Sequence, residues 1–202
     1  EPVPPAKHES EVGTDYTVPS TVATGLLYGI LTDTNRLTAG CSAADFAAAG
    51  YIHPGVDEDL LDRVANPEVS TEVLELKARA IAGRDVRGPF AVSDVGRLSN
   101  VDAIPQAADE LVQLEGVTAV VVLGESDGTI HLSGRSRDDR VHMGDTLDTA
   151  VSVLREGSAG GHARMGGGQL SIREGAIETV AGETVPRDGL RERLFDAMSG
   201  EI

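Results

Sequence analysis

Residues 117–125, VTAVVVLGE, form a nearly unbroken apolar run in which β-branched side chains dominate. A strand with one solvent-exposed face alternates apolar and polar residues, whereas an apolar run without alternation is typical of a strand buried on both faces. Such a strand needs a packed layer on each side of its sheet. The segments around it must therefore supply both layers.

Those segments alternate between strand and helix patterns. The Asp127-Gly128 turn predicts a hairpin that joins the apolar run to a strand within residues 128–136. Further strands are expected in PFAVSDVG and GQLSI, and helices in IPQAADELVQLEG, GDTLDTAVSVLREG and DGLRERLFDAM. We expect Asp145 to cap the second of these helices and Gly157 to follow its end. The pattern predicts an α/β domain with helices against a mixed sheet.

The part up to about residue 85 is expected to be mainly helical. Ser42 and Asp45 open SAADFAAAGYI with the spacing of a capping box. Two more helices are expected in DEDLLDRVAN and in VLELKARAIAGRDV, the latter ending near Gly83. A linker near residues 84–88 then divides the chain into domains at 1–85 and 86–202.

The chain is strongly acidic and almost devoid of lysine. Its 202 residues include 17 basic and 33 acidic ones, a formal charge of −16, and Lys7 and Lys77 are the only lysines. Such a surface resembles that of proteins from salt-loving microbes, although an ordinary acidic cytosolic protein is the alternative. The charge argues against a broad surface for duplex DNA, but it allows a small anionic ligand held by local arginines and backbone amides.

The cysteine content and the hydropathy of the sequence exclude several classes of protein. Cys41 is the only cysteine, so the chain has no internal disulfide and no cysteine-based zinc site. No apolar run approaches the roughly 18 residues of a membrane span. We therefore expect a soluble, cytoplasmic protein.

Three stretches carry residues suited to chemistry. Asp33, in GILTDTNRLT, is either a metal ligand at the end of a buried element or a cap of the next turn. Arg135 and Arg137 share one side of a strand. There they either bind phosphate oxygens together or form surface ion pairs with nearby carboxylates. The third stretch, GGHARMGGGQ, places His162 between glycines and is either a hinge or a backbone cradle for an anion. Its glycines are Gly160, Gly161, Gly166, Gly167 and Gly168.

Together these stretches resemble the DHH phosphoesterases that carry a DHH-associated C-terminal domain. GILTDTNRL is similar to the fourth motif of that family, GI-x-x-DT-x-x-F, and GGHARMGGG is similar to the signature GGH-x-x-A-x-G of the associated domain. The family includes RecJ exonucleases, NrnA-type nanoRNases, pAp phosphatases and exopolyphosphatase-related proteins. The resemblance covers about residues 20–200. It implies a helical end of the DHH domain followed by the α/β associated domain.

The resemblance also implies roles for individual residues. Asp33 would be a catalytic ligand of a manganese or magnesium pair. The substrate's phosphate or terminal nucleotide would be held by Arg135, Ser136, Arg137 and His162 with Gly160, Gly161, Gly166 and Gly167. The implied reaction is metal-assisted hydrolysis of a phosphoester in a short nucleic acid or a nucleotide.

This chain departs from the family pattern in several places. Leu37 stands where the family has phenylalanine, and Met165 stands where it has alanine. The family's earlier motifs, which are an N-terminal D-x-D, a middle aspartate and the DHH triplet, are absent, and His8 does not replace the histidine of that triplet. The chain is therefore expected to start just after the triplet and to hydrolyse poorly by itself. A nucleotide-binding or regulatory module, an exopolyphosphatase-like hydrolase and a purely structural glycine hinge are the alternatives.

Overall fold

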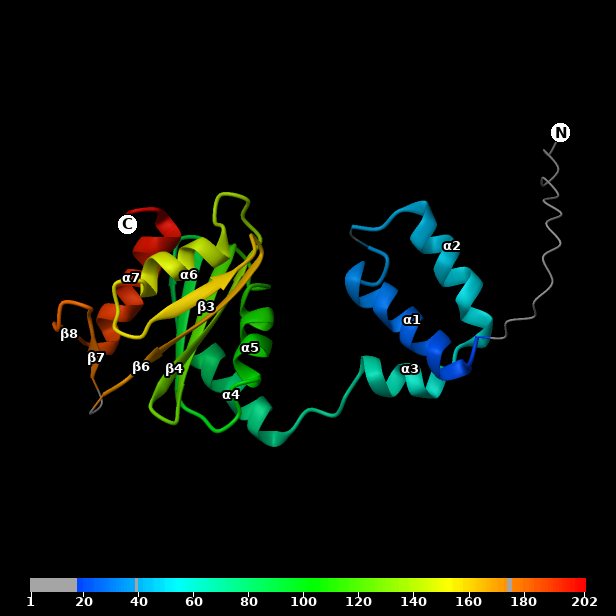
Figure 1. Cartoon of the computed structure of the whole chain (residues 1–202), viewed down its shortest axis with the longest axis horizontal. Helices are drawn as coiled ribbons and strands as arrows, with labels where there is room; N and C mark the ends of the chain where they lie inside the picture. Colours follow the sequence, from blue (N-terminus) through cyan, green and yellow to red (C-terminus); the bar gives the residue numbers. More distant parts are fainter. Residues whose placement is uncertain (1–17, 39, 174–175) are drawn as a thin grey trace. The chain divides into compact units, whose positions relative to one another are not determined.

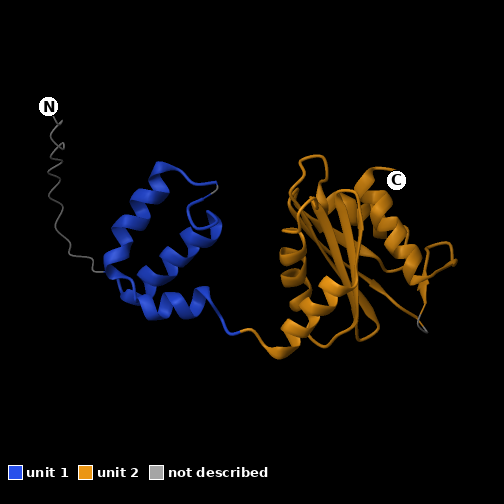
Figure 2. Cartoon of the chain, turned by 180° about the vertical axis from the view of Figure 1, so that it is seen from behind, with its two compact units in different colours: residues 1–68 blue, residues 69–202 orange. Residues whose placement is uncertain are grey.

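The computed structural model describes residues 18–38, 40–173 and 176–202. His8 lies outside these described residues. The chain forms two compact units, Glu1–Glu68 and Val69–Ile202, called unit 1 and unit 2 (Figure 2). The units divide before the helix that starts at residue 71, whereas the sequence predicts a domain boundary at residue 85. The assignment of the first part to the end of a DHH catalytic domain stays a prediction.

Unit 1 is built from short helices with a small core. The helices are α1 (Ser20–Asp33), α2 (Ala43–Ile52), the 3-10 turn η1 (His53–Gly55) and α3 (Glu58–Ala65). Ala23, Leu27 and Ala49 are its buried apolar residues among those described. The predicted capping box is confirmed, because Asp45 accepts hydrogen bonds from the backbone N–H and the hydroxyl of Ser42 at 2.7 and 2.8 Å. The backbone bond, more than the hydroxyl bond, lowers the pKa of Asp45.

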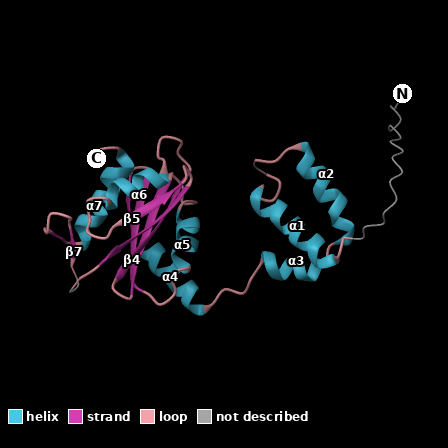
Figure 3. Cartoon of the chain, viewed as in Figure 1, coloured by secondary structure: helices cyan, strands magenta, loops and turns pink. Residues whose placement is uncertain are grey.

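The strands of the structure lie in unit 2 (Figure 3). Six of them form a mixed sheet in the order β1-β2-β3-β4-β6-β5. Only β2 and β3 run parallel, and the other neighbours are antiparallel. The strands of this sheet are β1 (Arg84–Arg87), β2 (Phe90–Arg97), β3 (Ala119–Ser126), β4 (Thr129–Ser136), β5 (Ser158–Gly161) and β6 (Met165–Ser171). A small second hairpin pairs β7 (Ile177–Glu178) with β8 (Thr184–Val185). The predicted fold class is confirmed.

Helices cover both faces of the sheet, as the sequence of β3 requires (Figure 1). Val120 and Val122 lie in a core with side chains of α4 (Thr71–Ala82) and α5 (Ala103–Leu111). Val121 and Leu123 lie in a second core with side chains of α6 (Met143–Val151) and α7 (Arg187–Ser199). Because all four strand residues are at most 1% exposed, β3 is the centre of a three-layer domain. The predicted hairpin is also confirmed, with Ser126 paired to Thr129 across Asp127 and Gly128.

Three local predictions were wrong. Residues 84–87 form the edge strand β1 rather than a linker, and α4, expected in the first domain, packs on α5. The N-cap of α6 is His142 rather than Asp145, because Nδ1 of His142 accepts the backbone N–H of Asp145. The helix therefore begins at Met143, which is buried. The same helix ends at Val151, since the chain beyond it pairs with residues 178–180: the N–H of Arg155 donates to the carbonyl of Glu178 at 2.7 Å.

The glycine segment forms a hairpin rather than a loop. Gly160 pairs with Gly167 and Gly161 pairs with Gly166, so most of the segment belongs to β5 and β6. Helix α6 approaches this hairpin so closely that a Cβ on Gly144 would lie 2.7 Å from the carbonyl carbon and oxygen of Gly161. Real Cβ atoms do not come this near, so glycine is required at the contact.

Within the described parts of the chain, every helix is too short or too polar to cross a membrane.

The Gly144→Ala variant is expected to lower the free energy of unfolding of unit 2 by about 1–3 kcal/mol, the usual cost of forcing atoms into a packed contact. Urea denaturation followed by far-ultraviolet circular dichroism measures the change. Gly160→Ala is the matched control, because its Cβ would meet nothing within 4 Å. The control should stay within about 0.5 kcal/mol of the parent. Equal stability of both variants would contradict the close contact of α6 with β5.

Candidate functional site

The glycine hairpin presents two different faces. Successive side chains of a strand point to opposite sides of the sheet. Gly166 points toward α6, where its Cβ would lie 3.1 Å from Leu147 Cδ1. Gly167 and its partner Gly160 point the other way, and there a Cβ would meet only Leu132 O at 3.7 Å for Gly167 and nothing for Gly160. The hairpin is therefore packed on one side and open on the other.

We call the open side of β4, β6 and β5 the glycine face. Strand alternation and register place on it the following residues: His131, Ser133 and Arg135 from β4, Met165, Gly167 and Gln169 from β6, and Ser158 and Gly160 from β5. A shallow depression of about 440 Å³ lies over its β5–β6 part. Helix α5 packs on β3 and β4, while Gly160, Gly167 and Gln169 are exposed. A flat ligand can thus reach the backbone of the hairpin.

Arg135 is held rigidly at the border of this face. Its Nε donates to Oδ1 of Asp109 on α5 at 2.6 Å, and its Nη2 lies 3.5 Å from Oδ2. Its Nη1 donates to Ser133 Oγ and to the Gly134 carbonyl, both at 3.0 Å. The Arg135 side chain is 17% exposed. A guanidinium fixed in this way loses little conformational freedom when it binds a ligand with its one remaining N–H group, on Nη2.

Arg137 and Ser136 are placed differently from each other. Arg137 follows β4 and reaches the same helix as Arg135, because its Nη1 donates to the Val112 carbonyl at 3.3 Å just beyond α5. Ser136 is buried on the opposite side of the sheet, and its hydroxyl closes a turn with Asp138. The side-chain hydrogen bond from Arg140 holds the pKa of Asp138 well below its usual range.

The structure thus separates the glycine residues and Ser136 into two groups. Gly160 and Gly167 lie on the glycine face, whereas Ser136, Gly161 and Gly166 face α6. Only the first group is positioned with Arg135.

His162 lies at the tip of the hairpin and its side chain is exposed. Its backbone N–H donates to the Met165 carbonyl at 2.8 Å. Its carbonyl accepts the N–H of Gly144 at 3.2 Å, and the Ala163 carbonyl accepts that of Met143 at 3.1 Å. The first-turn N–H groups of α6 are therefore occupied by the protein, so the helix N-terminus is not available to an anion.

Asp33 is the last residue of α1 and is exposed. Its carboxylate makes no hydrogen bond to the described residues. The turn after it is held by buried Thr34, whose Oγ1 donates to the Ile30 carbonyl at 2.6 Å and accepts the Leu37 N–H at 3.0 Å. The alternative role of Asp33 as a turn cap is therefore not what the structure shows. The following three residues, Asn35, Arg36 and Leu37, have φ of 46°, 59° and 60°, a left-handed conformation costly for side chains other than glycine.

Asp33 does not stand in a metal site formed by the described residues. Across residues 18–38, 40–173 and 176–202, no three side chains of His, Cys, Asp or Glu come together to hold an ion. Manganese and magnesium require several oxygen or imidazole ligands at once. The described part of the chain therefore does not by itself fit the implied metal pair.

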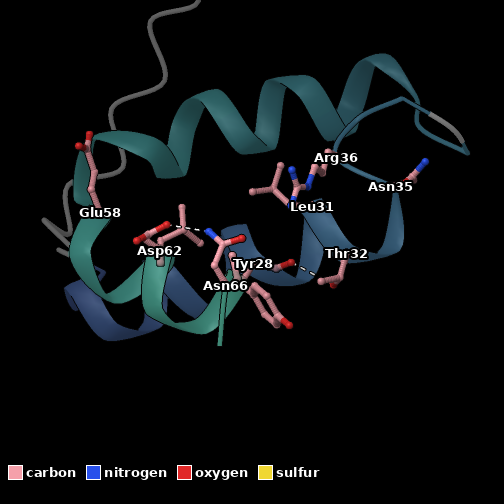
Figure 4. A pocket seen from close by; sticks show the side chains of 10 residues that line it. Tyr28, Leu31, Thr32, Asn35, Arg36, Glu58, Asp62 and Asn66 are labelled. Carbon is pink, nitrogen blue, oxygen red and sulfur yellow. Dashed lines mark hydrogen bonds between the residues drawn. The ribbon is translucent and has the colours of Figure 1, made fainter. Parts of the chain in front are cut away.

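Unit 1 also has a groove of about 520 Å³ between α1 and α3 (Figure 4). Tyr28, Leu31 and Arg36 line it from α1 and the turn, and Asp62 and Asn66 line it from α3. Asp62 accepts a hydrogen bond from Asn66 at 2.7 Å. Asp33 itself does not line this groove, although Thr32 and Asn35 close to it in the sequence do.

Sequence reasoning missed several residues of the glycine face. Ser133 and His131 alternate with the apolar residues of β4, and this period of two was a usable signal. Gln169 and Ser158 could be placed only with the register of the β5–β6 hairpin. Asp109 comes from a helix 26 residues before Arg135, and no local pattern connects the two.

Comparison with known proteins shows what unit 2 is similar to. Residues 87–182 match the DHHA1 domain. These residues contain the sheet from β2 to β6 and the glycine hairpin. The match lies in the second half of the chain and includes the glycine motif on which the resemblance to the DHH-associated domain rests.

Two curated relatives are much longer than this chain. An uncharacterized protein of Methanocaldococcus jannaschii is 35% identical over 182 residues, which cover 90% of this chain and 36% of the relative. The cyclic-di-AMP phosphodiesterase GdpP of Geobacillus thermodenitrificans is 32% identical over 181 residues, which cover 88% of this chain and 25% of the relative. The chain thus spans about a third and a quarter of their lengths.

A solved structure has a similar fold. The exopolyphosphatase-related protein of Bacteroides fragilis aligns with a TM-score of 0.69 and 15% identity, covering 90% of this chain and 51% of that protein. At this identity the likeness concerns the fold alone.

Thr34→Val is expected to lower the stability of unit 1 by about 1–2 kcal/mol, because the Leu37 N–H loses its partner and the Ile30 carbonyl loses one of its two donors. Tyrosine fluorescence during urea denaturation reports this unit selectively, since Tyr16, Tyr28 and Tyr51 are the only tyrosines. Thr32→Val is the control, because Thr32 is exposed and its hydroxyl bonds only carbonyls of its own helix. If the two variants unfold at the same urea concentration, Thr34 does not hold the turn.

Proposed function

We propose that this chain is the C-terminal portion of a metal-dependent DHH-type phosphoesterase that hydrolyses short nucleic acids or nucleotides. The DHHA1 match and the likeness to a protein named as a phosphodiesterase support the class of activity. One observation carries the part played by this chain: Arg135 is fixed by Asp109 and Ser133 beside an uncovered glycine backbone. That arrangement suits binding of the substrate.

In this proposal the glycine face holds the phosphate-bearing end of the substrate. Arg135 offers its one remaining N–H group, on Nη2, to a phosphate oxygen as a charge-assisted hydrogen bond. Gly160 and Gly167 let the ligand approach the backbone. His162, exposed at the hairpin tip, and Arg137 beyond β4 are further donors near the border.

Asp33 is proposed as one ligand of a manganese or magnesium site. Its carboxylate is exposed, makes no hydrogen bond within the described residues, and precedes three residues held in a costly conformation. Strain of this kind is found preferentially at functional sites. Its partners for the metal must come from side chains other than those described.

A non-catalytic nucleotide-binding module is the second candidate. The lack of a metal-binding cluster in the described part of the chain favours it for this chain alone. Both candidates require binding on the glycine face. They differ in turnover, which only the catalytic proposal requires of the full-length protein.

The test measures binding and hydrolysis of a short oligoribonucleotide and of pAp with Mn²⁺. This chain is expected to bind both without turnover, and Arg135→Ala should weaken binding about tenfold, the loss expected when a charge-assisted hydrogen bond is removed. Arg63→Ala, an exposed arginine on α3, is the control. The full-length product of the gene should hydrolyse at least one substrate, and Asp33→Asn should abolish that turnover.

The outcomes separate the candidates. Binding by both proteins with no turnover in either would favour the binding module and remove Asp33 from catalysis. Absence of binding, or equal affinity of the parent and Arg135→Ala, would overturn the role of the glycine face.

A further inference from the structure

Strand β1 is a free edge of the six-stranded sheet. It pairs with β2 on one side, and no other strand among the described residues pairs with its outer side. A free edge leaves backbone N–H and C=O groups that can bind another strand. The outer side of β1 is therefore a surface on which a partner can add a strand.

The turn after β1 determines which backbone groups point outward. Gly88 and Pro89 form a two-residue hairpin turn, and Gly88 has a φ of 57°, as the first central residue of a type II′ turn requires. In such a hairpin the residues that flank the turn form a hydrogen-bonded pair, and hydrogen-bonded pairs then alternate with pairs that are not. The flanking residue of β1 is Arg87, so Arg84 and Val86 direct their N–H and C=O groups away from β2.

The side chains of β1 lie on both faces of this edge. Val86 pairs with Ala91, which belongs to the core under α4 and α5, and Val86 is 43% exposed. Asp85 and Arg87 lie on the opposite face, where Arg87 bonds Asp85 at 2.9 Å and Glu192 of α7 at 2.6 Å. Asp85 Oδ1 and Arg87 Nε make no hydrogen bond with the described residues, so each side chain keeps an atom for a partner.

The edge is complementary to a second copy of itself. When two β1 strands pair antiparallel about a two-fold axis at Val86, the outward N–H and C=O groups of the two Val86 residues bond each other. The same register places Asp85 opposite Arg87 of the second copy, and this favourable pair of opposite charges occurs twice. A two-fold axis at Asp85 would instead place two carboxylates opposite each other, which is unfavourable. The order of charges along β1 therefore selects one register.

This edge also differs in charge from the chain as a whole. Its ionisable side chains are Arg84, Asp85, Arg87 and the neighbouring Glu192, so two cations balance two carboxylates. The chain carries a formal charge of −16, and two such chains repel each other. A surface without net charge is where a second copy meets the least repulsion.

We propose that two copies of this chain form a symmetric dimer, in which their β1 strands pair antiparallel about a two-fold axis at Val86 and join the two sheets into one. An interface of this kind uses the same patch on both copies, so assembly stops at the dimer. Strand β5 lies at the opposite edge of each sheet, and the glycine faces therefore stay uncovered. The inference concerns assembly and is independent of the proposed hydrolysis.

Light scattering during gel filtration of the 202-residue chain tests the dimer. A buffer with about 0.5 M NaCl screens the repulsion between the two acidic chains. As the protein concentration rises from about 1 to 100 µM, the measured mass should change from that of one chain to that of two. Val86→Lys should raise the dissociation constant at least about tenfold, because two ammonium groups would meet at the two-fold axis.

Val153→Lys is the matched control. Val153 follows α6 and is 39% exposed, close to the exposure of Val86. Since both positions are exposed, both variants should keep the circular dichroism spectrum of the parent, and only Val86→Lys should lose the dimer.

Disulfide formation tests the register. In a Cys41→Ser background, oxidised glutathione should join two copies of Val86→Cys, since the two-fold axis brings their Cα atoms to about 5.5 Å, a distance that a disulfide spans. Arg84→Cys is the control, because the same register separates its two copies by roughly 14 Å along the strands. Non-reducing gel electrophoresis measures the covalent dimer of each variant.

Several outcomes would overturn the inference. The mass of a single chain at every concentration would exclude the dimer, and a dimer unaffected by Val86→Lys would place the interface elsewhere. Masses that grow beyond two chains would indicate open pairing of β1 with β5. Equal cross-linking of Val86→Cys and Arg84→Cys would exclude the two-fold axis at Val86. None of these measurements uses a substrate, so their outcome is independent of the proposed function.

Discussion

The contact of α6 with the β5–β6 hairpin determines the shape of the whole candidate site. Gly144 lies against the backbone of Gly161, and the first N–H groups of α6 bond to the carbonyls of His162 and Ala163. The helix is thereby capped by the hairpin tip, while the hairpin is fixed by the helix. Because this contact buries Gly166 on the side of α6, the more accessible backbone of the hairpin is that of Gly160 and Gly167 on the other side.

The glycines of the segment consequently have two separate functions. Gly161 and Gly166 are required by packing, since a Cβ on Gly161 would lie 2.3 Å from the Met165 carbonyl. Gly160 and Gly167 have no such neighbour, so packing does not explain the lack of a side chain there. A hinge would not need the continuous pairing of β5 with β6, and therefore the open glycines are better explained by a ligand than by flexibility.

Sequence reasoning succeeded where the physical signal was local. The apolar run of β3, the Asp127-Gly128 turn and the Ser42–Asp45 capping box each depend on residues within a short window, and each is confirmed. It failed where partners are distant: glycine has little preference for strands, so the pairing of β5 with β6 was invisible. The α6 cap failed for a related reason, because distant Ala163 and His162 bond the first turn and leave His142 as the cap.

Most arginines of this acidic chain are paired with carboxylates, and this pairing determines how the candidate site can bind an anion. Arg87, Arg140 and Arg164 each bond a carboxylate within 3 Å, and Arg135 does the same at the glycine face. In a chain with a formal charge of −16, these cations are largely neutralised before any ligand arrives. Long-range attraction of an anion is therefore weak, and affinity must come from fixed hydrogen bonds and close backbone contact. A rigid guanidinium next to bare glycine supplies both, which is why arginine rather than lysine suits this position.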